Sequence, residues 1–202
     1  QKVSTYLTSF KKERRVALRK GLTEEHDADP LHFPLYSKLC IWFIVDSNPF
    51  AWVYQVLLWN CMGRSSSVDR LGLHNLKLGT DSLIVTYNDS KTDNTGERVH
   101  PKNVYANLYN PSICPFLSLS VWCALSPDQF NRTDALFLHK GTELGVATRK
   151  FGTHLRTLLK ANAEEVATYG DGDQIKAHSA RKGSATFLTA GTTDPPPLPS
   201  VG

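Results

Sequence analysis

The sequence predicts a mainly helical α+β fold with a small antiparallel β-hairpin or sheet. Apolar residues recur at helical spacing in several stretches, and prolines and glycines mark the ends of these stretches. Residues 82–87 are instead rich in β-branched and aliphatic residues, and a polar turn and a second extended stretch follow them. The chain has 202 residues, of which 41% are hydrophobic, so it is long enough to bury a core and is not disordered over most of its length.

The first twenty residues are strongly basic. They hold seven Lys/Arg and one acid, a local charge of +6, whereas the whole chain carries +4. We expect residues 3–20 to form a helix with a basic face, and residues 21–34 to form a break rich in glycine, proline and acids. We interpret residues 1–30 as a basic helical segment or linker and residues 31–202 as the main domain. A basic segment on a near-neutral body suits a polyanionic partner, although an exposed helix end would carry the same charge.

Two apolar helices are expected at the start of the main domain. Residues 35–46 place their apolar side chains at helical spacing. Asn48 and Pro49 predict the start of the second helix, with Pro49 at its first helical position. Arg64 then lies at or just past the end of that helix.

The middle of the chain is expected to form the hairpin. Residues 68–78 are a turn or short helix that leads into strand structure, residues 82–87 form one strand, and residues 98–108 form the return strand. Lys91 follows the first strand, at the neck of the hairpin. Pro101 restricts the return strand to an edge of the sheet, because proline has no backbone N–H to donate.

Three further elements are expected toward the C-terminus. Residues 115–125 form a helix that starts at a proline, and residues 136–138 form a short apolar segment. Residues 149–165 form a helix with an apolar side and a basic side, and residues 177–188 form the last helix. From Gly191 onward the prolines indicate a loop or an untethered end.

Cysteine and histidine spacing predicts neither a disulfide framework nor a metal site. The cysteines are irregularly spaced without a CxxC pair, and they suit small core residues in a reducing compartment. The longest apolar run, residues 50–59, is too short to span a bilayer, so we expect no membrane partner. The four cysteines are Cys40, Cys61, Cys114 and Cys123, and the histidines without metal-ligand spacing are His26, His32, His74, His100, His139 and His154.

The most specific pattern is the pair His178 and Arg181. Residues three apart at the start of a helix share one face of its first turn. That end of a helix attracts anions through its free N–H groups and dipole, and arginine can clamp a phosphate with two parallel hydrogen bonds. Arg64 could supply a second arginine from another element. Taken singly, Arg64 could equally be a helix cap, and the other two a local helix-start pair.

Arg64, Lys91, His178 and Arg181 occur in this order, and together they resemble the catalytic domain of the tyrosine recombinases, which has the phage-integrase fold. The likeness covers about residues 35–200 and is closest to crypton-type eukaryotic mobile elements. It rests on CMGRSSSV around Arg64, SKTD around Lys91, HSARKGSAT from His178 and GTTDPP from Gly191. The resemblance makes residues 1–30 a remnant of the core-binding domain and residues 31–202 the catalytic domain.

The resemblance implies metal-free and cofactor-free DNA strand transfer through a phosphotyrosine link. Arg64 and Arg181 would neutralise the transition-state phosphate, Lys91 would protonate the leaving 5′-oxygen, and His178 would hydrogen-bond the phosphate and assist proton movement. The implied partner is double-stranded DNA, bound by a homo-oligomer, a tetramer in this family, with a nuclear location. The expected DNA-backbone contacts are Arg149, Lys150, Arg156 and Lys182.

Two departures from the family pattern affect the expected activity. The acidic residue that often lies three positions after the first arginine is Ser67 here, and Asp69 is the nearest substitute. No tyrosine follows Arg181, so we expect an inactive domain that is incomplete at its C-terminus. The alternatives are a domesticated DNA-binding protein without catalysis and, less favoured, a type IB topoisomerase. The tyrosines are Tyr6, Tyr36, Tyr54, Tyr87, Tyr105, Tyr109 and Tyr169.

Overall fold

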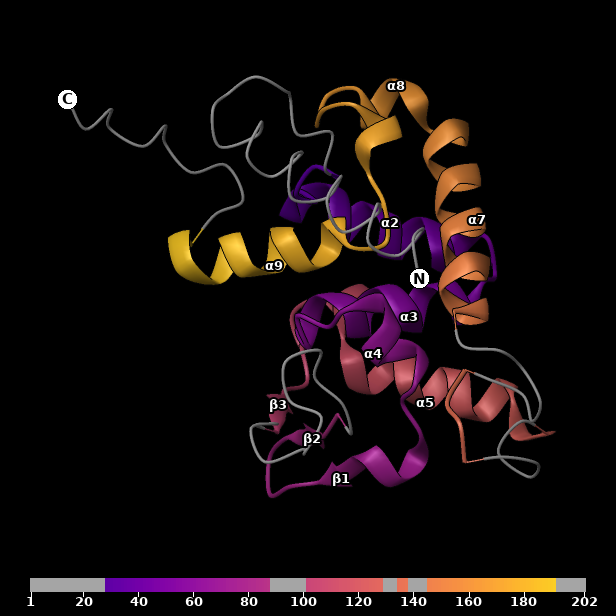
Figure 1. Ribbon diagram of the computed structural model, residues 1–202, viewed down its shortest axis with the longest axis vertical. Helices are drawn as coiled ribbons and strands as arrows, with labels where there is room; N and C mark the ends of the chain where they lie inside the picture. The colour runs from indigo at the N-terminus through magenta and orange to yellow at the C-terminus, as the bar shows by residue number, and fades with distance from the viewer. Residues whose placement is uncertain (1–27, 88–100, 129–133, 138–144, 192–202) are drawn as a thin grey trace, which may run out of the picture.

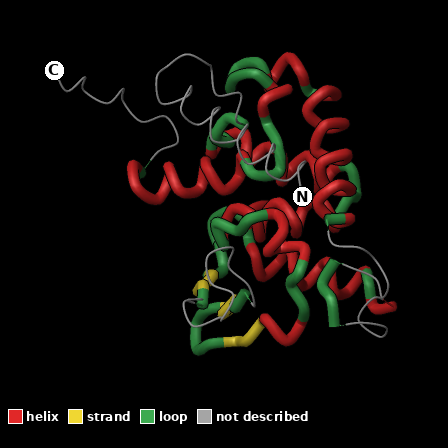
Figure 2. The backbone as a smooth tube through the Cα atoms, in the orientation of Figure 1, coloured by secondary structure: helices red, strands yellow, loops and turns green. Residues whose placement is uncertain are grey.

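The computed structural model describes residues 28–87, 101–128, 134–137 and 145–191. The predicted basic helix at residues 3–20 and the predicted general acid Lys91 lie outside the described residues. Within the described ranges, helices make up most of the fold and three short antiparallel strands form a small sheet at one end (Figures 1 and 2). This agrees with the α+β, mainly helical class that the sequence predicts.

The helix α3 (Pro49–Asn60) forms the centre of the core. The side chain of Asn48 accepts a hydrogen bond from the backbone N–H of Ala51 at 3.0 Å, and Pro49 occupies the first turn, as predicted. Every residue from Phe50 to Trp59 is buried, because α2 (Phe33–Val45), α5 (Pro115–Leu125), α7 (Val146–Ala161) and α9 (Ser179–Ala190) all pack against α3. A helix that is apolar on all sides needs such a covering.

A turn after α3 leads through the short helix α4 (Ser65–Asp69) to the sheet. The strands β1 (Leu76–Leu78), β2 (Leu83–Val85) and β3 (Lys102–Val104) pair in that order, with Leu76 opposite Val85 and Leu83 opposite Val104. The predicted antiparallel pairing of the two strands is confirmed, while the predicted turn between them lies outside the described residues. β3 is an edge strand directly after Pro101, as expected. The sheet gains β1, which the sequence indicated only as a stretch leading into strand structure.

The helix α5 (Pro115–Leu125) begins at the predicted proline and covers one side of α3. Its Trp122 donates a hydrogen bond from Nε1 to the carbonyl oxygen of Leu136 at 2.9 Å. Leu136 and Phe137 are buried, so the predicted apolar segment is part of the core. The tryptophans therefore serve packing, since Trp52, Trp59 and Trp122 are all buried.

The predicted helix at 149–165 is two helices, so this prediction was wrong in its continuity. The helix α7 (Val146–Ala161) ends at Asn162, and α8 (Ala163–Val166) follows at once. The side-chain amide of Asn162 donates to the carbonyl oxygen of Leu158 at 2.9 Å, and this local bond competes with the helical pattern. The predicted apolar side of α7 is correct: Phe151, Leu155, Leu158 and Leu159 are buried.

The last helix, α9 (Ser179–Ala190), lies across α2 and α3 (Figure 1). Gly183 makes this close packing possible, since a Cβ there would collide with the carbonyl of Leu31 and lie 2.9 Å from the ring of Trp59. The backbone N–H of Leu31 in turn donates to the carbonyl oxygen of Ser179 at 2.9 Å. Residues 28–31 thus pack with the body of the fold. None of the helices in the described ranges is both long and apolar enough to cross a bilayer.

Candidate nucleic-acid interface

Arg64 is half-buried at the N-cap of α4, directly after a tight turn that ends α3. Met62 in this turn has φ +48°. The next residue, Gly63, is buried, and a Cβ there would come within 2.9 Å of both the Tyr87 hydroxyl and a methyl of Val68. A larger residue would require Tyr87 or Val68 to shift, so Gly63 allows the turn before Arg64 to pack closely against Tyr87. The sequence predicted Arg64 at or just past the end of the helix that starts at Pro49, which is correct. In addition, Arg64 marks the start of α4.

His178 and Arg181 lie at the start of α9. His178 is the N-cap residue and Arg181 is in the first helical turn, because the helix begins at Ser179, two residues later than the predicted start at residue 177. Both side chains are exposed. They therefore lie at the end of a twelve-residue helix where backbone N–H groups and the dipole favour an anion.

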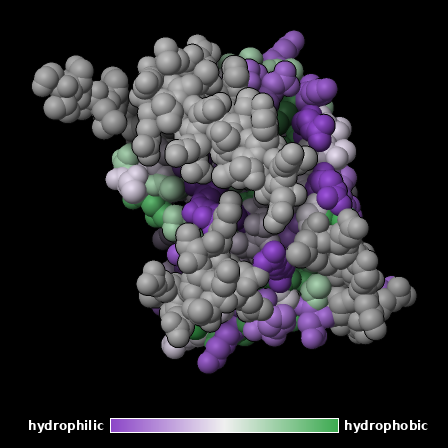
Figure 3. Space-filling model, in the orientation of Figure 1, coloured by the Kyte–Doolittle hydropathy of each residue, from purple (hydrophilic) through white to green (hydrophobic). Residues whose placement is uncertain are grey.

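A cavity of about 580 Å³ joins these segments, and we call it the α7 cavity. Its walls are the start of α4, one side of α7 and the stretch that leads into α9. Basic side chains predominate over the single acid in this lining. The residues that line it are Ser65, Thr148, Arg149, Gly152, Thr153, Leu155, Arg156, Asp173, Ile175, Lys176, Ala177 and His178. In the space-filling view, hydrophilic side chains gather over α4 and along α7 (Figure 3).

Tyr87 connects the turn at Gly63 with Arg181. Burial raises the pKa of the Tyr87 hydroxyl above its usual value, the neighbouring Cys61 thiol raises it further, and the positive charge of Arg181 lowers it. The hydroxyl has no nitrogen or oxygen hydrogen-bond partner among the described residues, and the Cys61 thiol is the polar group beside it. Gly63 lies next to Tyr87, and Ser65 lines the α7 cavity together with His178, so the segments that carry Arg64 and His178 share this cavity.

The four predicted DNA-backbone contacts have different surroundings. Arg149 and Arg156 are exposed and line the α7 cavity. Lys150 lies over the ring of Phe50, with its Nζ 4.6 Å from the ring centroid. Lys182 donates from Nζ to the carbonyl oxygen of Ala28 at 2.8 Å, so its ammonium group helps to hold the N-terminal segment against α9. Two of the four basic groups therefore face the cavity.

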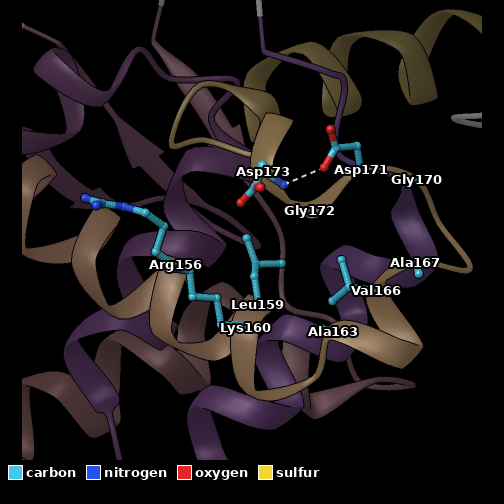
Figure 4. Close-up of a pocket in the computed structure, with 10 residues that line it drawn as sticks. All are labelled: Arg156, Leu159, Lys160, Ala163, Val166, Ala167, Gly170, Asp171, Gly172 and Asp173. Atoms are coloured by element: carbon cyan, nitrogen blue, oxygen red, sulfur yellow. Dashed lines mark hydrogen bonds between the residues drawn. The ribbon is translucent and has the colours of Figure 1, made fainter.

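A second cavity of about 410 Å³ lies at the C-terminal half of α7, between α7, α8 and the turn at Gly170–Asp173 (Figure 4). Leu159 and Val166 give it an apolar floor. In the turn, the Asp171 carboxylate accepts the backbone N–H of Asp173 at 2.9 Å. Arg156 and Asp173 line both cavities, and the guanidinium of Arg156 points away from the turn (Figure 4).

The sequence did not reveal two groups at the α7 cavity. Lys176 belongs to no recognisable motif, because the sequence cannot distinguish a single lysine before a helix from any other exposed lysine. Thr148 belongs to a buried network with Asp69, which the sequence offered only as a substitute for the missing acid of the family pattern. Asp69 is 1% exposed and accepts a hydrogen bond from Thr148 at 2.9 Å. Its partners come from elements far apart in the sequence, so no local pattern could have shown them.

Within the described residues, no group of three or more His, Cys, Asp or Glu side chains is arranged to hold a metal ion. The chain matches no protein-family model, no curated protein and no solved structure. The resemblance to the tyrosine recombinases therefore rests on the quoted motifs and stays a prediction.

Proposed function

We propose that this chain binds the phosphate backbone of double-stranded DNA with a clamp of the tyrosine-recombinase type. The observation that carries the proposal is that Arg149, Arg156 and His178 line the α7 cavity, while Arg64 directly precedes Ser65 in its wall and Arg181 lies in the first turn of α9 after His178. These residues come from three segments of the chain, and their shared chemistry is positive charge and hydrogen-bond donation. Such a set suits phosphate oxygens better than a neutral substrate.

The chemistry of the clamp follows from its groups. Arginine stays protonated at all physiological pH values and offers two parallel N–H donors to one phosphate. The N-terminal end of α9 adds backbone N–H groups and a favourable dipole beside His178 and Arg181. In strand transfer such a clamp would stabilise the charged transition state. We expect residues 1–202 by themselves to hold DNA without forming a covalent link, because none of their tyrosines follows Arg181, where the resemblance implies the nucleophile.

The test is equilibrium binding of a short fluorescent duplex, measured by anisotropy at low salt. We expect the wild type to bind, and Arg64→Ala and Arg181→Ala each to weaken binding about tenfold, since a charged hydrogen bond to phosphate contributes about 1–3 kcal/mol. Lys77→Ala is the matched control, because Lys77 is an exposed cation on β1, an element that carries none of the residues of the proposed clamp. Equal effects of all three substitutions would mean non-specific charge attraction and would contradict the clamp.

The absence of covalent chemistry has its own test. A nicked suicide duplex is incubated with the chain, and the mixture is separated under denaturing conditions. We expect no protein–DNA adduct. An adduct that persists after denaturation would contradict this part of the proposal and would identify another tyrosine as nucleophile.

A further inference from the structure

A polar network ties α4 and α7, which line the α7 cavity, to the central helix α3. Asp69, the last residue of α4, accepts hydrogen bonds at Oδ1 from the Tyr54 hydroxyl at 2.7 Å and from the Thr148 hydroxyl at 2.9 Å. Tyr54 belongs to α3 and Thr148 to α7. The two hydroxyl oxygens also lie 2.9 Å apart, so the three side chains form one closed cluster.

Stability alone does not explain a carboxylate at this position. Asp69 is 1% exposed, and its second oxygen, Oδ2, has no hydrogen-bond partner among the described residues. Burial of a carboxyl group with half of its acceptors unused is unfavourable. An apolar side chain of similar volume would fill such a site at lower free-energy cost.

The geometry gives the network a positional effect. Arg64 begins α4, a helix of only five residues, which is too short to keep its direction without tertiary bonds. The Tyr54 hydroxyl lies 3.1 Å from the carbonyl oxygen of Ser65, the first residue of α4. Thr148 directly precedes Arg149 and lines the cavity opposite Ser65. One cluster thus fixes the end of α4 next to Arg64 relative to the end of α7 next to Arg149.

We propose that Asp69 is a positioning residue that holds Arg64 and Arg149 at the spacing needed to grip neighbouring phosphates. This inference rests on the proposed DNA binding. Asp69 itself is buried and does not touch the nucleic acid. Its hydrogen bonds to Tyr54 and Thr148 determine where the two arginines lie.

The test compares Asp69→Leu, which removes the acceptor, with Asp69→Asn, which keeps an acceptor oxygen at Oδ1. We expect Asp69→Leu to weaken duplex binding about tenfold while its Tm stays equal or rises, and Asp69→Asn to bind within about threefold of the wild type. Ser118→Ala is the matched control, because it removes a buried hydrogen bond of α5 far from the cavity, at 3.1 Å to the Pro115 carbonyl oxygen. It is expected to lower Tm without changing affinity.

A double-mutant cycle separates positioning from a general loss of packing. In an Arg149→Ala background, Asp69→Leu should cost clearly less affinity than in the wild type, because the group it positions is already absent. Wild-type affinity in Asp69→Leu, or a full additive loss in the Arg149→Ala background, would overturn the proposal. If Asp69→Leu does not fold, the isosteric Thr148→Val takes its place with the same expectations.

Amide hydrogen exchange tests the positioning role of Asp69 separately from DNA binding. If the wild-type chain binds no duplex, the proposed function fails. The network is then judged on the exchange of the amides of residues 65–69. Faster exchange there in Asp69→Leu than in Ser118→Ala supports the positioning role, and unchanged exchange overturns it.

Discussion

The arginines of the candidate clamp differ from the other basic residues in what surrounds their charges. The charge of Arg181 is close enough to Tyr87 to affect its pKa, whereas Lys150 covers an aromatic ring and Lys182 bonds a backbone carbonyl. The sequence alone identified the residue types of the clamp, because the spacing of His178 and Arg181 and the pair Gly63–Arg64 are local patterns. It could not separate Arg149 from Lys150, which are neighbours in sequence with different surroundings in space.

Two buried tyrosines allow a matched test of hydrogen bonding. Tyr54 donates to Asp69 at 2.7 Å, but the Tyr87 hydroxyl has no nitrogen or oxygen partner among the described residues. Tyr54→Phe should lower the free energy of unfolding by about 1–3 kcal/mol, because it leaves Asp69 with fewer donors. Tyr87→Phe should leave this free energy unchanged or raise it slightly. Urea denaturation at neutral pH measures both, and equal losses would show that Tyr87 is bonded after all.

At the scale of elements, the sequence predicted the helices well where apolar spacing and prolines agree. α3 and α5 both start at the predicted proline. It missed the break at Asn162, since a single polar residue inside a helical pattern is a weak signal against the pattern around it. It also could not place β1 in the sheet, because that strand has only three residues and its pairing with β2 is a tertiary contact.

The packing of α9 depends on Gly183. We expect Gly183→Ala to destabilise the fold by about 1–3 kcal/mol, because the new methyl group would collide with the Leu31 carbonyl and force α9 away. Gly152→Ala in α7 is the matched control. Among the described residues, no atom outside the neighbouring helix backbone lies within 4 Å of the added Cβ, so this change should stabilise the helix by about 0.5–1 kcal/mol. Thermal unfolding of the two variants compares them, and a Gly183→Ala variant as stable as the wild type would contradict the observed contact.

Asp173 lines both cavities, and its charge leads to a prediction for DNA binding. Asp173 is the acid in the lining of the α7 cavity, and removal of its charge should favour an approaching phosphate. Asp173→Asn is expected to strengthen duplex binding about twofold to threefold at low salt and less at high salt. Asp46→Asn, an exposed acid at the end of α2, is the control and should have no effect. Weaker binding by Asp173→Asn would place the DNA elsewhere.

At the scale of the whole molecule, the core holds several protonated groups that resist ionisation. Burial raises the pKa of the Cys61 thiol from 9.0 to about 11, and it raises the pKa values of Cys40 and Tyr36 as well. Above about pH 9 the unfolded chain therefore loses these protons before the folded chain does. The stabilisation of the fold by these protonated groups is therefore complete below the pKa values of the unfolded chain, and it is lost as the pH rises above them.

We expect the free energy of unfolding to be flat from pH 7 to about pH 8.5 and then to fall by about 1.4 kcal/mol per pH unit for each such group. Urea denaturation across this range measures the slope. In a Cys40→Ala/Cys61→Ala double variant the decline below pH 10 should be clearly shallower, because only Cys123 remains among the thiols whose pKa burial raises. A wild-type profile that stays flat to pH 10.5 would contradict the assignment.

The central claim is that the arginines around the α7 cavity bind DNA phosphates. Because each phosphate contact releases counterions, the logarithm of the binding constant should fall with the logarithm of salt concentration at a slope of roughly −0.9 per contact. The decisive measurement is this slope for the wild type and for the Arg64→Ala/Arg181→Ala double variant. The account predicts a variant slope that is shallower by about two. Equal slopes, or no binding by the wild-type chain, would contradict it.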